Sequence, residues 1–143
     1  MPAAQVVGPR GNEFVVDESD LPILSVTYPE HANEESLDAV WAEFVRVTGE
    51  NRRIAFLLDV RPTNPIAVSA RLRRYNADLH ERFKNDLAKS TVCEARVVSS
   101  SLVRGLIIAF DWIKGDGLWP CNTFTSMAEA RAWCHERLAE REH

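Results

Sequence analysis

Hydrophobic and polar residues follow two rhythms along this chain, one typical of strands and the other of helices. Residues 13–17 and 21–28 are short β-rich runs separated by a turn-prone segment, and they predict a hairpin. Residues 53–60 are apolar almost throughout, which is typical of a strand buried on both faces of a parallel sheet. Residues 92–98 and 117–124 predict two further strands, so we expect five strands in all.

Four helices are predicted between and after these strands, each from a capping residue followed by apolar positions at helical spacing. The second predicted helix begins with a cap followed by proline at its first position, and its apolar stripe extends to Leu87. The third spans residues 102–114 and ends at Gly115. The expected caps are Asn33, Asn64, one of Ser99, Ser100 and Ser101, and Thr125 or Ser126.

The predicted order, β-β-α-β-α-β-α-β-α, indicates an α/β domain with a mixed, mostly parallel five-stranded sheet and right-handed crossovers. Residues 1–12 contain two prolines and two glycines without periodicity and are expected to form a flexible leader. We therefore expect one domain over residues 13–140 and a frayed terminus at residues 141–143.

Composition agrees with a single domain, because 143 residues that are 45% apolar can bury a sizeable core. The longest apolar run is only Leu106 to Phe110, far short of a membrane span, and the N-terminus shows no signal-peptide pattern. We expect a cytoplasmic protein. The three cysteines have no C-x-x-C spacing and lie in apolar-patterned segments, so we expect Cys93, Cys121 and Cys134 to be reduced and buried.

Charge is distributed unevenly, with an acidic first stretch of 60 residues and a basic stretch over residues 61–89. The net charge of −4 disfavours nucleic acid as a partner, because phosphate neutralisation drives that affinity. The basic face of the second helix, which includes Arg71 and Arg74, is either simply solvated or docks on an acidic protein surface.

The element order and two segments resemble a known superfold. The segments are Ile54–Arg61 (IAFLLDVR), as a central strand that leads to a helix, and Phe124–Trp133 (FTSMAEARAW), as a last strand and helix. Over about residues 13–140 the chain resembles the SpoIIAA-like superfold, which contains the STAS domains, and in particular its small bacterial members. The resemblance implies strands that follow one another in a β-α superhelix, and a non-catalytic regulatory role in protein–protein interaction or signalling.

One motif of that superfold is missing. STAS anti-sigma-factor antagonists carry an Asp-Ser pair after the central strand, and a partner kinase phosphorylates the serine. The matching stretch of this chain lacks the pair, and its only hydroxyls are Thr63 and Ser69. These two residues are the candidate phospho-acceptors.

Two candidate binding surfaces follow from the predicted topology. Carboxyl ends of parallel strands meet at one edge of a sheet, so an anion could be held there by Arg61, Asn64, Ser99, Ser100 and Ser101, although ordinary helix capping explains the same residues. The helix at 102–114 has more apolar positions than a sheet-packed helix needs, which predicts an interface with a partner protein or a second copy. The expected interface residues are Arg104, Ile108 and Trp112, joined by Arg71 and Arg74, and burial within the domain is the alternative.

No catalytic motif is present, and the four histidines have no metal-ligand spacing. We therefore expect no enzyme activity, no cofactor and no metal. A regulatory protein-interaction module is the first functional hypothesis. A carrier or sensor that binds a small apolar ligand or a lipid between sheet and helices is the second.

Overall fold

The computed structural model describes residues 4–63, 68–100, 104 and 118–140. Within these residues one six-stranded sheet is present, and its strand order follows the chain. The strands are β1 (Ala4–Val7), β2 (Phe14–Asp17), β3 (Ile23–Thr27), β4 (Ile54–Asp59), β5 (Thr91–Val97) and β6 (Cys121–Phe124). The helices are α1 (Glu34–Glu50), α2 (Ala70–Ala88) and α4 (Met127–Glu140).

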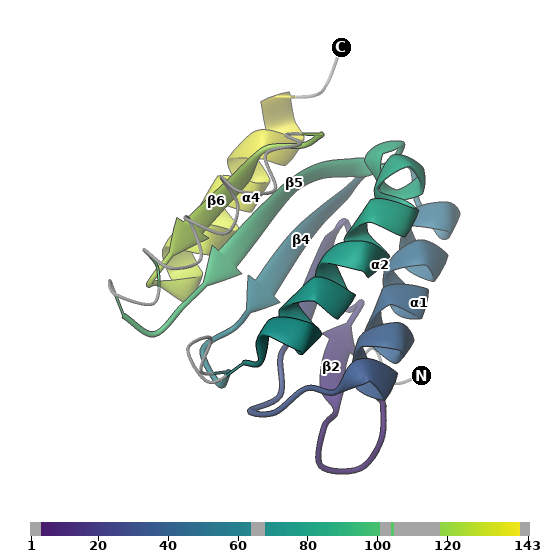
Figure 1. The fold of residues 1–143 in the computed structure, drawn as a ribbon. Coiled ribbons are helices and arrows are strands. Elements are labelled where there is room, and N and C mark those ends of the chain that lie inside the picture. The colour runs from purple at the N-terminus through teal and green to yellow at the C-terminus, as the bar shows by residue number, and fades with distance from the viewer. Residues whose placement is uncertain (1–3, 64–67, 101–103, 105–117, 141–143) are drawn as a thin grey trace.

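The sheet is mixed and mostly parallel, which confirms the predicted α/β class. The pairs β3–β4, β4–β5 and β5–β6 are parallel, whereas β1–β2 and β2–β3 are antiparallel, so the expected hairpin is present as β2 and β3. Each parallel pair is joined by a long crossover, as the geometry of parallel strands requires. Figure 1 shows the strands from β2 to β6 side by side in this order.

The expected number of strands was wrong, because β1 lies inside the segment predicted as a flexible leader. It pairs with β2 in the register Val7 to Phe14, and most of its residues are exposed. Gly8 and Gly11 have positive φ angles of 106° and 90° in the connection between the two strands, a conformation that glycine adopts without strain. The strand is therefore defined by its backbone pairing and not by burial.

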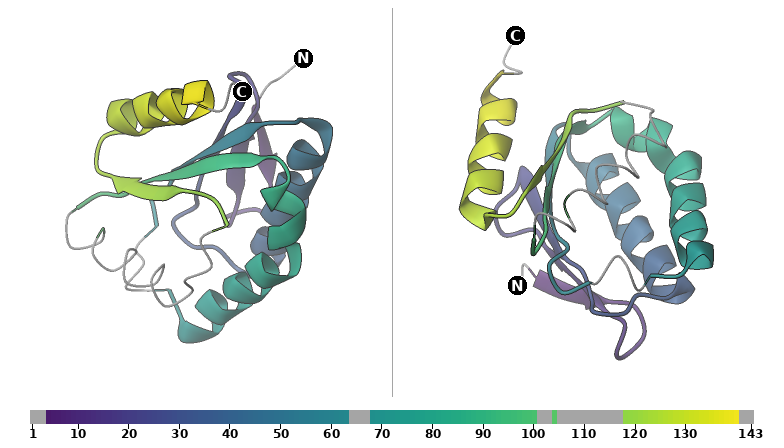
Figure 2. Two further views of the ribbon diagram at one scale, coloured as in Figure 1. Left: turned by 90° about the horizontal axis from the view of Figure 1, so that it is seen from above. Right: turned by 60° about the vertical axis from the view of Figure 1, so that its left-hand side comes forward.

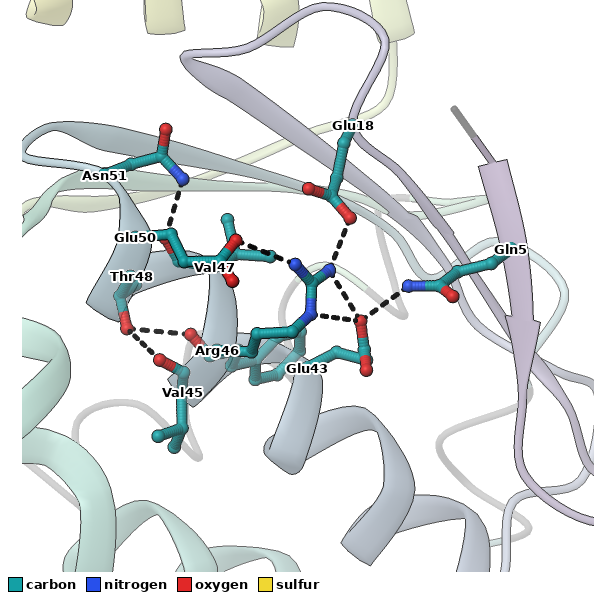
Figure 3. A network of polar contacts seen from close by, with 10 residues as sticks. Gln5, Glu18, Glu43, Val45, Arg46, Val47, Thr48, Glu50 and Asn51 are labelled. Atoms are coloured by element: carbon teal, nitrogen blue, oxygen red, sulfur yellow. Dashed lines mark hydrogen bonds and ion pairs between the residues drawn. The ribbon is translucent and has the colours of Figure 1, made fainter. Parts of the chain in front are cut away.

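A network around Arg46 attaches this N-terminal hairpin to α1 (Figure 3). The Arg46 guanidinium donates to Glu43 Oε1 through Nε at 3.1 Å, to Glu50 Oε1 through Nη1 at 2.9 Å, and to Glu18 through Nη2. Gln5 of β1 donates to the same Glu43 oxygen at 2.6 Å. Arg46 thus connects α1 to the turn after β2, and Glu43 connects the same helix to β1.

The sheet lies between two helical layers, with α1 and α2 on one face and α4 on the other (Figure 2). Alternation along β4 shows how both layers are filled: Ile54, Phe56 and Leu58 belong to the core beneath α1 and α2, and Ala55 and Leu57 to the core beneath α4. A strand buried on both faces needs apolar residues at every position, which explains the continuous apolar run.

Helix α1 begins as predicted. The Asn33 side chain accepts from the Ser36 backbone N–H at 2.8 Å, and Ser36 Oγ accepts from the Asn33 backbone N–H. Helix α2 begins later than predicted, at Ala70, and its cap is Ser69, whose Oγ accepts from the Leu72 N–H at 3.0 Å. Asn64 lies outside the described residues.

The predicted last helix is confirmed as α4, with Ser126 Oγ accepting from the Glu129 N–H at 3.2 Å. The predicted helix at 102–114, with Ile108 and Trp112, lies outside the described residues apart from Arg104, which is helical and exposed. No helix in the described part of the chain is long and apolar enough to cross a membrane.

Two of the three cysteines are buried as predicted. Cys93 on β5 and Cys134 on α4 are both fully buried in the core beneath α4, and the contact with the Cys134 thiol, together with burial, raises the pKa of Cys93. The expectation for Cys121 was wrong, because it is exposed at the start of β6. None of the three forms a disulfide.

Candidate ligand-binding site

A cavity of about 170 Å³ lies between the sheet and the N-terminal parts of α1 and α2, near the carboxyl ends of β3 and β4. Its walls are mainly apolar. The sheet contributes Phe14, Tyr28 and Val60, and the helices contribute Leu37 of α1 and Leu72 of α2. Phe14 and Tyr28 pack edge to face with their ring centroids 4.9 Å apart, so part of the wall is aromatic.

Local structure explains why these side chains meet. Tyr28 and Val60 each follow directly on a strand, β3 and β4, and the Tyr28 N–H donates to the Asp59 carbonyl oxygen at 2.9 Å. Carboxyl ends of parallel strands share one edge of the sheet, where crossover helices begin. The cavity therefore occupies the edge at which a sequence of this fold class is expected to bind a ligand.

Asn76 contributes a polar group whose orientation is fixed. The indole Nε1–H of Trp41 donates to Asn76 Oδ1 at 2.8 Å, and Trp41 is only 6% exposed. An indole N–H can only donate, so the carbonyl of the Asn76 side chain must face it and the amide NH₂ must point elsewhere. That NH₂ group makes no hydrogen bond with any other residue that the structure describes.

Among the described residues, Arg73 and Thr63 are the other polar side chains that line the cavity besides Asn76 and Tyr28. The Arg73 guanidinium donates through Nη1 to the Val68 carbonyl oxygen, and Thr63 Oγ1 donates to the Pro29 carbonyl oxygen. Arg73 is half-buried, whereas Arg71 and Arg74 of the same helix are exposed. No aspartate or glutamate is among the described residues that line this cavity.

Burial of the Tyr28 ring raises the pKa of its hydroxyl, and the nearby Glu94 carboxylate raises it further against the opposing effect of Arg96. The tyrosine is therefore neutral at pH 7. Its O–H makes no hydrogen bond within the described part of the chain. A neutral phenol at this position can donate a hydrogen bond to a bound molecule.

Sequence reasoning missed an ion pair on β5. Glu94 and Arg96 face the α1 and α2 side, because Glu94 is in register with Phe56. The Glu94 carboxylate accepts from Arg96 Nε at 2.6 Å and from Trp119 Nε1 at 3.1 Å, and the two charged side chains are only 12% and 17% exposed. The signal available in the sequence was two opposite charges at alternate positions of the strand predicted over residues 92–98.

His80 of α2 packs edge to face between Trp41 and Trp119, at ring-centroid distances of 5.9 Å and 5.8 Å. The described residues contain no group of three or more histidine, cysteine, aspartate or glutamate side chains that could hold a metal ion.

The edge predicted to bind an anion is described only in part. Arg61 donates to Asp59 through Nε and Nη2, both at 2.9 Å, and this pairing lowers the pKa of the Asp59 carboxyl. Ser99 and Ser100 are exposed beyond β5, and Asn64 and Ser101 lie outside the described residues. The Arg61 guanidinium is thus already engaged by a carboxylate of its own strand.

Of the residues predicted to bind a partner, the structure describes Arg71, Arg74 and Arg104, while Ile108 and Trp112 lie outside the described residues. Arg71 and Arg74 are exposed on α2, and Arg71 Nε lies 3.1 Å from Glu34 Oε2 while the side chain stays 84% exposed. Ser69, one candidate phospho-acceptor, caps α2, and the other, Thr63, is bonded to Pro29.

A second cavity, of about 470 Å³, lies at the opposite end of the sheet and is lined by Arg52, Arg53, Lys89, Leu118 and Trp119 among others. Arg53 Nη2 donates to the Leu138 carbonyl oxygen at 2.6 Å, and Lys89 lies 3.8 Å from Asp86. Arg53 therefore connects the start of β4 to α4.

Comparisons with known proteins add no further constraint. The chain matches no model of a protein family, no curated protein and no solved structure. The evidence for function therefore comes from the cavities and the residues around them.

Proposed function

We propose that the chain is a non-catalytic binding module of the SpoIIAA-like type that holds a small, mainly apolar ligand between its sheet and helices α1 and α2. The observation that supports this proposal is the cavity formed by Phe14, Tyr28, Leu37, Val60 and Leu72. Largely preformed apolar cavities with a few polar groups are the usual form of small-molecule sites.

The volume of the cavity favours a small ligand over a lipid, the two ligand classes expected from the sequence. An engineered apolar cavity of roughly 150 Å³ binds benzene. The present cavity, about 170 Å³, suits an aromatic ring or a short aliphatic chain with a small head group. A lipid with long acyl chains would not fit inside it, so we favour a small ligand.

The experiment is a titration with benzyl alcohol, a neutral probe of about the right size, followed by amide chemical shifts in ¹⁵N-labelled protein. Shifts should concentrate around Tyr28, Val60 and Leu72. The Leu72→Trp variant should fill the cavity and weaken binding at least about tenfold, because the added ring takes the volume that the probe needs.

Leu21→Trp is the matched control, because Leu21 is 37% exposed and does not line the cavity. It should bind the probe as the wild type does. Scattered shifts in the wild type, or equal binding by both tryptophan variants, would remove the proposal. Native mass spectrometry of protein purified without detergent then tests for a ligand retained from the cell.

A protein-interaction module is the second candidate function. It is supported by the exposed Arg71 and Arg74 on α2, which could meet the acidic first part of a second copy or another acidic protein. Sedimentation decides the self-association part: a dimer that dissociates in the Arg71→Glu, Arg74→Glu double variant supports it, and a monomeric wild type removes it.

A further inference from the structure

We propose that the ligand of the α1–α2 cavity is a small neutral alcohol or phenol, whose hydroxyl is bound by Asn76, Thr63 and Tyr28 and whose apolar body lies against the aromatic wall. This inference rests on the proposed function, because it specifies the polar group of the ligand in the same cavity. It follows from the hydrogen-bonding groups that the side chains of the wall leave unused.

Asn76 offers the ligand a donor only. Its side-chain carbonyl accepts from the Trp41 indole at 2.8 Å, and the NH₂ group that remains has no partner among the residues that the structure describes. An NH₂ group of this kind donates and does not accept. A ligand that satisfies Asn76 must therefore carry an acceptor.

Thr63 offers the opposite function. A threonine hydroxyl has one proton, and Thr63 Oγ1 donates it to the Pro29 carbonyl oxygen, so that only the lone pairs of the hydroxyl are left for a ligand. In the described part of the chain, no other residue forms a hydrogen bond with this oxygen. A ligand that satisfies Thr63 must therefore carry a donor.

Tyr28 can bind a ligand in either direction. Its hydroxyl is neutral at pH 7, because burial and the nearby Glu94 carboxylate raise its pKa, and it has no hydrogen-bond partner among the described residues. A neutral phenol donates to a lone pair or accepts from an O–H group. The wall thus presents one donor, one acceptor and one group that can act as either.

A hydroxyl is the smallest group that both donates and accepts, so it matches this combination. A carboxylate only accepts and an ammonium group only donates, so each ion would leave either Thr63 or Asn76 without a partner. Each ion would also lose its hydration against walls that are mainly apolar. The match does not need Arg73, whose guanidinium donates to the Val68 carbonyl oxygen and takes part in a further interaction.

The volume limits the body of the ligand to a ring or a short chain. About 170 Å³ is close to the roughly 150 Å³ that accommodates benzene. Phe14 and Tyr28, packed edge to face at 4.9 Å, offer an aromatic wall to that body. The inferred class is therefore that of phenols, benzyl alcohols and short aliphatic alcohols.

The test compares the calorimetric affinities of four ligands of similar shape at pH 7. Benzyl alcohol carries the hydroxyl, ethylbenzene has no polar group, benzoate is an anion and benzylamine is protonated to a cation. The wild type should bind benzyl alcohol about tenfold or more tightly than either ion, because each ion loses hydration without gaining a full set of partners.

Two tyrosine variants test the hydrogen bonds of the wall. Tyr28→Phe removes the hydroxyl and keeps the ring, so it should weaken the binding of benzyl alcohol about fivefold and leave the affinity for ethylbenzene unchanged. Tyr75→Phe is the matched control, because the Tyr75 hydroxyl donates to Asp38 Oδ1 at 2.7 Å and Tyr75 does not line the cavity. It should bind both ligands as the wild type does.

The outcomes distinguish the two proposals. If either ion binds as tightly as benzyl alcohol, or if Tyr28→Phe binds the alcohol as the wild type does, the hydroxyl assignment is overturned, and binding of ethylbenzene in the cavity still supports the proposed function. If none of the four ligands binds in the cavity, the proposed function fails and the hydroxyl assignment fails with it.

Discussion

The hydrogen bond between Trp41 and Asn76 joins the two helices that cover the cavity, and Asn76→Ala removes it. Trp41 is 6% exposed, so its indole N–H would be left without a partner and with little access to water. An unsatisfied buried donor costs about 2 kcal/mol. Alanine is the better helix former by roughly 0.5 kcal/mol, which reduces the expected loss of stability to about 1.5 kcal/mol.

The predicted loss can be measured by thermal unfolding and by urea unfolding, each followed by tryptophan fluorescence. For a chain of 143 residues, an unfolding entropy of about 2.1 cal/mol/K per residue converts 1.5 kcal/mol into a fall of about 5 °C in the melting temperature. The change should appear in the denaturation midpoint with an unchanged slope, since the folded structure is otherwise preserved.

Asn85→Ala is the matched control, because it makes the same substitution at an exposed position of the same helix. It should stabilise the protein slightly through the helix propensity of alanine. The two variants should therefore differ in sign. If Asn76→Ala is as stable as Asn85→Ala, the bond to Trp41 contributes nothing, and the orientation of the Asn76 amide loses its support.

Two further predictions concern titration and thiol reactivity. The pKa of Tyr28 is raised in the folded protein above its unfolded value near 10, so its contribution to stability is present below pH 10 and is lost as the pH rises above that value. Tyr28→Phe should therefore flatten the fall in the free energy of unfolding between about pH 9 and 11. An unchanged slope of that fall would contradict this reasoning. In the native protein a disulfide reagent should modify Cys121 alone, because Cys93 and Cys134 are fully buried. If all three thiols react before denaturant is added, the core beneath α4 is open to the reagent.

Those parts of the fold that depend on local signals could be predicted from the sequence. The apolar run that became β4, the Asn33 cap of α1 and the Ser126 cap of α4 each leave their signal within a few residues. Periodicity and capping depend on residues that are close in the chain, so the sequence predicts the α/β class and most of the element order correctly.

Non-local features were missed for a physical reason. The residues of β1 are mostly exposed, so their strand conformation depends on backbone pairing with β2 and leaves no hydropathy pattern. Both Asn64 and Ser69 are good helix caps by residue type, and the sequence offers no means to choose between them. The structure selects Ser69 as the cap of α2.

The cavity itself could not be predicted, because its wall comes from segments that are far apart in the chain. Sequence reasoning favoured the edge of the sheet at the carboxyl ends of the strands, which is where the cavity lies, but it chose residues that immediately follow the strands, such as Arg61. Arg61 pairs with Asp59, and the half-buried cation at this edge is Arg73, three residues inside α2. Arg73 was not among the predicted site residues, since its neighbours Arg71 and Arg74 are exposed and no local signal distinguishes it from them.

The ion pair on β5 explains why Tyr28 stays neutral although two charged side chains lie near it. Glu94 and Arg96 compensate each other on the sheet, and the Glu94 carboxylate also accepts from the Trp119 indole, so the region behind Tyr28 gains two charges without a net charge. Their opposing effects on Tyr28, together with its burial, leave the phenol protonated. Tyr28 therefore presents a neutral hydroxyl, which can both donate and accept a hydrogen bond, beside the aromatic face of Phe14.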